Sequence, residues 1–244
     1  MEQDSGRVLY AKNTDAVVPI ASLTKLMTAM VALDAELPLS EMVVITKEDM
    51  DTIKHTHSRL RVGAMLSRND LLRLALMSSE NRAAAALSRA YPGGRSAFVA
   101  AMNRKATKLG MRQTEFVDGT GLSSANVSTA ENLARLVRAA HEYPLIREYT
   151  TESHYTATLF SGQKLQYVNT NRLVKSPQWN IGLSKTGYIS EAGRCLVLQA
   201  TIVAKPVIIV LLDSWGTLTR IGDANRIRRW MESSNRLLHS AAGS

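Results

Sequence analysis

Cysteine is nearly absent from this sequence, because Cys195 is the only one and leaves no partner for a disulfide within the chain. It stands in the apolar run RCLVLQATIV, so we expect it to pack inside a strand. No stretch approaches the ~18–20 apolar residues of a membrane span. The first residues, MEQDSGRVLY, lack the basic and apolar regions of a secretion signal. If the protein is exported, we expect this to be a processed or trimmed form.

A clustered basic face is also lacking, although the formal net charge is +9. The Lys and Arg residues are spread along the chain without interleaved aromatic residues, and no recognised nucleic-acid motif occurs. This distribution argues against nucleic-acid binding and leaves a plain basic surface, or attraction to an anionic polymer. Internal repeats and low-complexity segments are absent as well. An apolar fraction of 45% in 244 residues is enough for one large domain or two small ones.

The apolar spacing predicts helices in the middle of the chain and strands at both ends. A turn at Asp4–Gly6 predicts a short N-terminal hairpin, Ala204–Pro206 predicts a tight connection between two strands, and the chain after Tyr143 reads as strand and turn. We expect helices at 19–35, 67–77, 81–91, 95–109, 129–142 and 223–238, and strands at 7–11, 181–189, 194–203 and 207–212.

The order of these elements predicts an α/β (α+β) fold, in which an antiparallel sheet is flanked by helices and an all-α region is inserted. Residues 1–16 and 181–244 would form the sheet and terminal helix, 17–150 the inserted helical region, and 151–180 connecting strands and loops. We expect one catalytic domain with its active site where the sheet meets the helical region.

A serine and a lysine stand three residues apart in PIASLTKLMTAM, at Ser22 and Lys25. On a helix, positions i and i+3 share a face, so a weak serine nucleophile would have a base beside it. Backbone N–H groups at a helix start favour the negative charge that develops there. The alternative is a pair of solvated polar residues. The same spacing at Ser161 and Lys164 lies in a turn-like stretch, where we expect surface residues.

The stretch MSSEN places Ser79 and Asn81 where one helix stops and the next begins. A hydroxyl and an amide here would serve proton relay and substrate positioning, although helix capping is the ordinary role of a serine at such a junction. Further along, Lys185, Thr186 and Gly187 interrupt a predicted strand. Glycine weakens a strand and marks close approach of a backbone or ligand, and Lys185 would bind a carboxylate.

These three elements occur in one order, as S-x-x-K, S-x-N and K-T-G, a trio found in class A β-lactamases and penicillin-binding proteins. Beyond the trio, the sequence resembles the low-molecular-mass penicillin-binding proteins, serine D,D-peptidases of the D-alanyl-D-alanine carboxypeptidase family. SSENRAAA, YPGG and the NTN stretch look most like the D-alanyl-D-alanine endopeptidase branch, penicillin-binding protein 7/8. Further matching segments include FVDGTGLSSANVSTAENLARL and WNIGLSKTGYISEAGRCLV.

The resemblance implies the serine β-lactamase/D,D-peptidase fold and the catalytic roles. Ser22 would be the acylated nucleophile and Lys25 its base, with Ser79 and Asn81 in proton relay and substrate positioning. For substrate binding it implies Lys185, Thr186, Gly187 and Tyr188. Lys185 and Thr186 would hold the substrate carboxylate, and the backbone N–H groups of Ser22 and Tyr188 would form the oxyanion hole.

The resemblance also implies the setting of the reaction. The substrates would be peptidoglycan stem peptides and their D-Ala to meso-diaminopimelate cross-links, and β-lactam antibiotics would be covalent inhibitors. No cofactor, metal, nucleic acid or membrane span is expected, and the compartment would be the periplasm. The family's first strand and secretion signal are missing and no C-terminal amphipathic anchor is visible, so we expect a trimmed form.

Three other functions stay open. A D-Ala-D-Ala carboxypeptidase would share all these residues. A serine β-lactamase would need a deacylating glutamate, and Glu115 and Glu131 lie in about the right interval without the expected sequence context. A non-catalytic murein-binding module would keep only the fold. His55 and His57 have no further Cys or His at ligand spacing, so we expect loop residues rather than a metal site.

Overall fold

The computed structural model describes the backbone of residues 1–242 and the side chains of residues 1–235. The α-helices are α1 (Thr24–Asp34), α2 (Arg68–Met77), α3 (Asn81–Arg89), α4 (Gly94–Lys108), α5 (Ala130–Ala140), α6 (Pro144–Thr151) and α7 (Thr219–Ala242). The strands are β1 (Val18–Pro19), β2 (Met42–Val44), β3 (Met65–Ser67), β4 (Val127–Ser128), β5 (His154–Thr158), β6 (Lys164–Val168), β7 (Asn180–Ile189), β8 (Gly193–Ile202) and β9 (Lys205–Ser214). Single 3-10 turns are η1 (Ala21–Leu23), η2 (Lys47–Asp49) and η3 (Arg172–Lys175).

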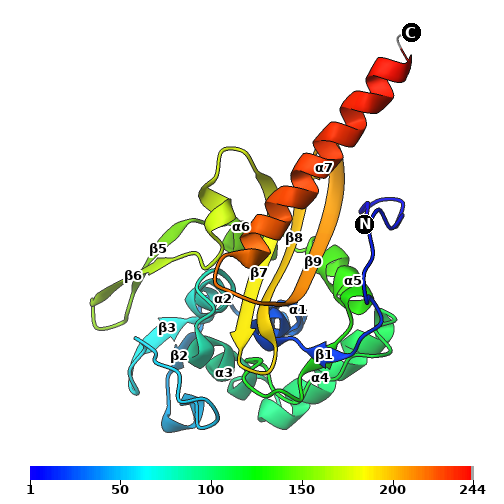
Figure 1. The fold of residues 1–244 in the computed structure, drawn as a ribbon. Coiled ribbons are helices and arrows are strands. Elements are labelled where there is room, and N and C mark those ends of the chain that lie inside the picture. Colours follow the sequence, from blue (N-terminus) through cyan, green and yellow to red (C-terminus); the bar gives the residue numbers. More distant parts are fainter. Residues whose placement is uncertain (243–244) are drawn as a thin grey trace.

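The main sheet is antiparallel, with strand order β7-β8-β9. Because successive side chains of a strand point to opposite faces, β8 serves two cores. Cys195 and Val197 pack into the large core formed with the helices, whereas Leu196 and Leu198 pack on the other face with α7 residues such as Ala224. Figure 1 shows α7 crossing the sheet on one side and the other helices gathered on its opposite side. The expected burial of Cys195 in a strand is confirmed.

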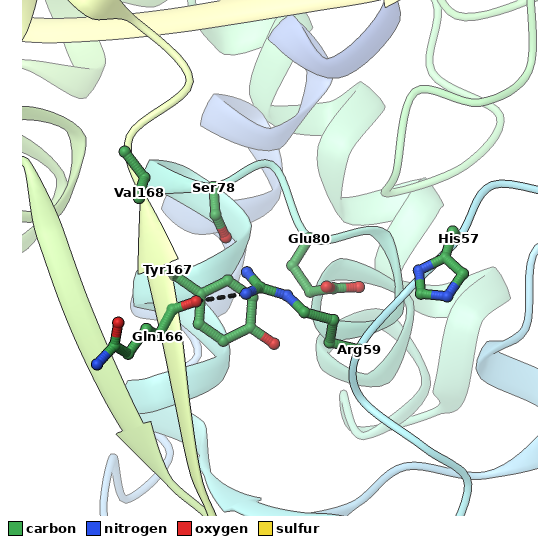
Figure 2. Close-up of a pocket in the computed structure, with 7 residues that line it drawn as sticks. All are labelled: His57, Arg59, Ser78, Glu80, Gln166, Tyr167 and Val168. Atoms are coloured by element: carbon green, nitrogen blue, oxygen red, sulfur yellow. Dashed lines mark hydrogen bonds between the residues drawn. The ribbon is translucent and has the colours of Figure 1, made fainter.

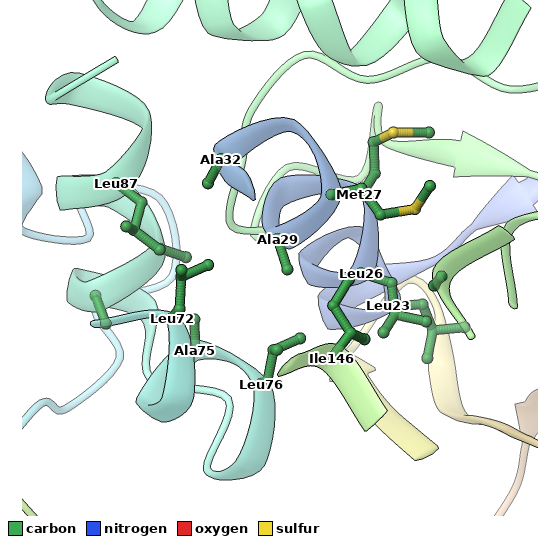
Figure 3. Packing of buried hydrophobic residues seen from close by; sticks show 14 of the residues in the cluster. Leu23, Leu26, Met27, Ala29, Ala32, Leu72, Ala75, Leu76, Leu87 and Ile146 are labelled. Atoms are coloured by element: carbon green, nitrogen blue, oxygen red, sulfur yellow. The ribbon is translucent and has the colours of Figure 1, made fainter. Parts of the chain in front are cut away.

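The large core is built around α1. Every residue from Thr24 to Ala32 is buried, as expected for a helix that is surrounded by protein rather than laid on a surface. Figure 3 shows its leucine, methionine and alanine side chains between α2, α3 and Ile146 of α6. The start of α1, which carries Lys25 and directly follows the turn η1 with Ser22, is therefore held by packing on all sides.

The predicted N-terminal hairpin is wrong in its second strand. Glu2 forms a bridge with Val207 at the edge of β9, and Gly6 makes the turn at a φ of +70°, but residues 7–17 form no strand. Val8 and Tyr10 are 59% and 66% exposed. A strand needs a neighbouring strand for its N–H and C=O groups. Among the described residues, the backbone of Arg7 bonds only to Glu2 and Ser5 within the turn, and residues 8–11 have no backbone partner.

Other element boundaries also differ from the expectation. The segment after Tyr143 begins with helix α6, whose first residue is a proline, a favoured position, and which buries Ile146 and Tyr149. Short strands β2 and β3 lie between α1 and α2 and pair with each other. The connection between β8 and β9 is made by Val203 and Ala204, both with positive φ, and Lys205 and Pro206 already belong to β9.

Candidate active site

Ser22 and Lys25 meet at the point where the chain enters α1. The α-helix expected from residue 19 begins only at Thr24. Before it, the chain forms the two-residue strand β1 and then the 3-10 turn η1, which contains Ser22. Ala21, with a φ of +47°, turns the chain into that position. Lys25 is fully buried in the first turn of α1, and its Nζ donates to the Ser22 Oγ at 2.8 Å.

Lys25 has two further acceptors. Its Nζ donates to the Asn81 Oδ1 at 2.8 Å and to the Thr120 carbonyl at 2.7 Å, so three protein oxygens replace the water lost on burial. Burial lowers the pKa of Lys25 to about 7, against the opposing pull of the carboxylates of Asp118, Glu80 and Asp51. A lysine of this pKa exchanges its proton near neutral pH, as a general base requires.

Ser79 lies between α2 and α3 with a φ of +60°, an unfavourable value for a residue with a side chain. It does not cap either helix, because Glu80 is the residue that caps α3 and Ser78 donates its hydroxyl to the Leu74 carbonyl of α2. Its Oγ instead accepts from the Lys185 Nζ at 2.9 Å. The strained backbone thus turns the hydroxyl toward the sheet.

Lys185 is 1% exposed, and its Nζ also donates to the Thr186 carbonyl at 3.0 Å. Burial is the main reason why the pKa of Lys185 is lowered well below its ordinary value, and the nearby positive charges of Lys25 and Arg220 lower it further. The Thr186 hydroxyl donates to the Thr170 hydroxyl at 2.7 Å. This corner of the site therefore offers hydrogen-bond donors to an anion, and a bound anion would favour the protonated form of Lys185.

Gly187 allows the edge of β7 to approach η1. A Cβ on Gly187 would stand 3.1 Å from the Ala21 Cβ, the Ile20 carbonyl oxygen and the Ser22 backbone nitrogen. The chain therefore needs glycine for close approach of two backbones. The Tyr188 side chain is 57% exposed, with the Arg194 guanidinium 4.5 Å from its ring centre. The backbone of β7 at Gly187 thus lies beside the backbone nitrogen of Ser22.

The loop before β4 was missed as part of the site. The Asp118 carboxylate accepts from three backbone N–H groups, those of Thr120, Gly121 and Ser123, and so fixes the Thr120 carbonyl against Lys25. A Cβ on Gly121 would stand 2.0 Å from the Ala21 carbonyl oxygen. The glycine-rich sequence DGTG at residues 118–121 was the one local feature that could have indicated that this loop lies against the site.

Thr56, Thr170 and Arg220 were also missed. The Thr56 hydroxyl accepts from the Asn81 Nδ2 at 2.9 Å, which fixes the amide with its oxygen toward Lys25. Arg220, near the start of α7, donates to the Gly187 and Cys195 carbonyls at 3.1 and 3.2 Å. Nothing in the local sequence around these residues marks them, because their partners are more than 15 residues away along the chain.

The remaining candidates lie elsewhere. Ser161 and Lys164 are exposed at the β5–β6 hairpin. Glu131 pairs with Arg135 at 2.6 Å on the surface of α5, and Glu115 lies in a backbone bridge with Val127. His55 and His57 are exposed loop residues, and residues 1–235 contain no group of three or more potential metal ligands. Of the candidates from the sequence, only the residues of the S-x-x-K, S-x-N and K-T-G elements lie together in one site.

Comparison with known proteins gives one consistent result. The sequence profile described as D-alanyl-D-alanine carboxypeptidase matches residues 1–216. A D-alanyl-D-alanine endopeptidase of Pseudomonas aeruginosa is 51% identical, with 95% of this chain and 75% of the relative covered. One of Escherichia coli is 48% identical, with 96% and 76% covered. A solved structure of a Streptomyces DD-transpeptidase superposes with a TM-score of 0.86 at 31% identity, covering 94% of each chain.

Proposed function

The chain belongs to the D-alanyl-D-alanine carboxypeptidase family of serine peptidases, and from this premise we propose that it is a peptidoglycan hydrolase. It acts as a D-alanyl-D-alanine endopeptidase, cleaving D-Ala to meso-diaminopimelate cross-links through an acyl-enzyme on Ser22. The same serine is acylated by β-lactams. The names of the relatives at 48% and 51% identity favour this activity.

The observation that carries the proposal is the hydrogen bond of 2.8 Å between the Lys25 Nζ and the Ser22 Oγ. Because the pKa of Lys25 is about 7, a substantial fraction of its amine is neutral at physiological pH. The neutral amine accepts the hydroxyl proton while the Ser22 Oγ attacks the D-Ala carbonyl carbon. Asn81 and the Thr120 carbonyl hold the lysine in place for this step.

The other members of the trio serve the remaining steps. The oxyanion accepts hydrogen bonds from the backbone N–H groups of Ser22 and Tyr188. The close approach of β7 to η1 at Gly187 supports this role. As the C–N bond breaks, the leaving amine takes a proton from Lys25 or through Ser79. Lys185 and Thr186 bind the carboxylate next to the scissile bond. Water then hydrolyses the ester and returns the proton to Ser22.

We further propose that the site lies between two parts of one catalytic domain, which are joined by connecting strands and loops at 151–180. One part is the helical region 17–150. The other consists of 1–16 and 181–244 and contains the sheet and the terminal helix; within 1–16 only residues 1–3 bond to β9, and residues 243–244 lie outside the described residues. The hydrogen bond between Lys185 and Ser79, which links these two parts, supports the division. Peptidoglycan as substrate implies the periplasm as compartment. In the described part of the chain, none of the helices is long and apolar enough to cross a membrane.

A D-Ala-D-Ala carboxypeptidase is the second candidate, because relatives with that name are 31–34% identical over much of the chain. Mass-spectrometric product analysis with two substrates distinguishes the two activities. One is a diaminopimelate-cross-linked muropeptide dimer, and the other is a monomeric pentapeptide ending in D-Ala-D-Ala. Conversion of the dimer to monomers with the pentapeptide untouched supports the endopeptidase. Release of D-alanine as the dominant reaction would make the protein a carboxypeptidase.

A further inference from the structure

A pocket of about 410 Å³ lies beside the trio and is not used by the mechanism above. Its wall includes Ser78 and Glu80, the two neighbours of Ser79, and Tyr167 and Val168 of β6. Figure 2 shows Arg59 stretched across it, with Gln166 and Tyr167 on one side and Glu80 and His57 on the other. A volume of this size is in the range of small-ligand sites.

The pocket lies beyond the corner that we assign to the substrate carboxylate. Lys185 contacts Ser79, whose neighbours line the pocket, and Thr186 contacts Thr170, which lies two residues after the end of β6. Because Lys185 and Thr186 would hold the carboxylate of the leaving group, the atoms of the leaving group beyond that carboxylate are the ones that would extend toward the pocket. In a D-Ala-D-Ala pentapeptide the leaving group is a single D-alanine, which has no such atoms.

Arg59 is the charged group that a ligand in this pocket meets. Its guanidinium lies 3.9 Å from the centre of the Tyr167 ring and donates to the Gln166 carbonyl, so it is oriented in advance. Arg59 is exposed, and it forms no ion pair with any side chain of residues 1–235. An arginine retains several N–H donors after one such bond, arranged to take a carboxylate.

Two other polar groups of the pocket are largely buried. Glu80 is only 9% exposed, and its carboxylate accepts from the Arg82 backbone N–H at the start of α3. The Tyr167 hydroxyl is buried and has no hydrogen-bond partner among the described residues. Burial raises the pKa of Tyr167, so this hydroxyl stays protonated and is a donor. The pocket thus presents one exposed cation, Arg59, whereas the Glu80 carboxylate and the Tyr167 hydroxyl beside it are buried.

We propose that the pocket formed by Arg59, Tyr167, Ser78 and Glu80 is a binding site for a second free carboxylate, one on the stem peptide that leaves with the amine. This inference rests on the proposed endopeptidase function and deepens it. It makes Arg59 a specificity residue that distinguishes a cross-linked substrate, whose leaving group is a whole stem peptide, from a pentapeptide that loses one residue.

The test compares Arg59→Ala with Arg61→Ala, which removes a charge from the same loop outside the pocket. Three rates are measured: kcat/KM for the cross-linked dimer, kcat/KM for the pentapeptide, and acylation by a penicillin. We expect Arg59→Ala to lower the first about tenfold, the worth of one charge-assisted hydrogen bond, and to leave the other two within about twofold. Arg61→Ala leaves all three unchanged. Equal loss on all three, or no loss on the dimer, would overturn the proposal.

A substrate change makes the test independent of folding. A dimer in which the amine-side carboxylates are amidated, except the one next to the scissile bond, should be cleaved about tenfold more slowly by the wild type. Arg59→Ala should cleave both dimers at the same reduced rate. If the variant still discriminates between them, the carboxylate is bound elsewhere.

Failure of the two proposals can be told apart. If the wild type leaves the dimer intact, the endopeptidase function fails, and the pocket is then tested by binding. The dimer is titrated into Ser22→Ala and Ser22→Ala/Arg59→Ala proteins by calorimetry. A dissociation constant about tenfold higher in the double variant supports the pocket, and equal constants refute it.

Discussion

Two buried lysines stand in the same site with opposite electrostatic surroundings. Near Lys25 the charges that act on the ammonium are carboxylates, those of Asp118, Glu80 and Asp51, and its pKa stays near 7 despite full burial. Near Lys185 the charges are the cations Lys25 and Arg220, and they add to the lowering of its pKa that burial causes. Burial alone therefore does not determine what a lysine does. The neighbouring charges decide whether it exchanges its proton at neutral pH or becomes protonated only when an anion binds.

Removal of Ser22, the proposed nucleophile, has the largest expected effect and tests the role of Lys25 as its base. Ser22→Ala should lower peptide hydrolysis on the order of 10⁴-fold or more and abolish covalent labelling by penicillin. Lys185 and its contacts are untouched, so binding of a substrate carboxylate should persist in the variant. The measurements are hydrolysis by chromatography and labelling by intact-protein mass spectrometry. Residual labelling would mean that another residue is acylated.

Replacement of each lysine by arginine tests the roles proposed for them, Lys25 as a base and Lys185 as a cation that binds an anion. Arginine stays protonated, so Lys25→Arg should lower the acylation rate about 10²- to 10⁴-fold, the range for loss of a general base. Lys185→Arg keeps the charge, and its effect should appear mainly in KM, by about tenfold. The measurement is the acylation rate of both variants. Thermal unfolding is the control that both variants are folded. Equal losses of the acylation rate would show that the two lysines do not differ in role.

The acidic surroundings of Lys25 predict a shift in the pH profile. Acylation requires the neutral amine, so its rate should rise with pH through about 7, where Lys25 loses its proton. Glu80→Gln removes a negative charge that favours the protonated form while keeping a side-chain acceptor for the cap. The pKa of Lys25 should then fall, and the rising limb should move to lower pH by less than about one unit.

A limb that moves upward in Glu80→Gln would contradict this assignment. Arg61→Ala, a charge change on the nearby loop, is a suitable control because Arg61 is not among the groups that shift the pKa of Lys25. Stopped-flow acylation by a chromogenic β-lactam between about pH 5 and 9 gives both profiles.

The smallest expected effect is the uptake of a fraction of a proton by Lys185 when the substrate binds. Because its pKa is lowered in the free protein, a bound carboxylate should raise it again, and substrate binding should take up protons at a pH between the two values. Calorimetric titration of Ser22→Ala protein with a D-Ala-D-Ala peptide in buffers of different ionisation enthalpy measures this uptake. The uptake should disappear in Ser22→Ala/Lys185→Arg. Absence of proton uptake in the Ser22→Ala protein would mean that Lys185 is already charged before the substrate binds.

Local pattern accounted for the helices and strands that are long or strongly periodic. β7, β8 and β9 and helices α2 to α5 lie where the apolar spacing predicted them, within a few residues. The errors fall on short elements. The eight-residue helix α6, the strands β2 and β3, and the 3-10 turn at Ser22 are too short to show a period. The absent strand at residues 7–11 depends on a neighbour that local sequence does not reveal.

What the sequence determined by itself is the set of reactive groups, because S-x-x-K, S-x-N and K-T-G are read from neighbouring residues. Only the tertiary structure decided how they work. The contact of Lys25 with Thr120 and of Asn81 with Thr56, and the pocket around Arg59, join segments 25 to over 100 residues apart. The pKa of a buried lysine depends on desolvation and on charges that such distant segments bring together, so it exists only in the folded chain.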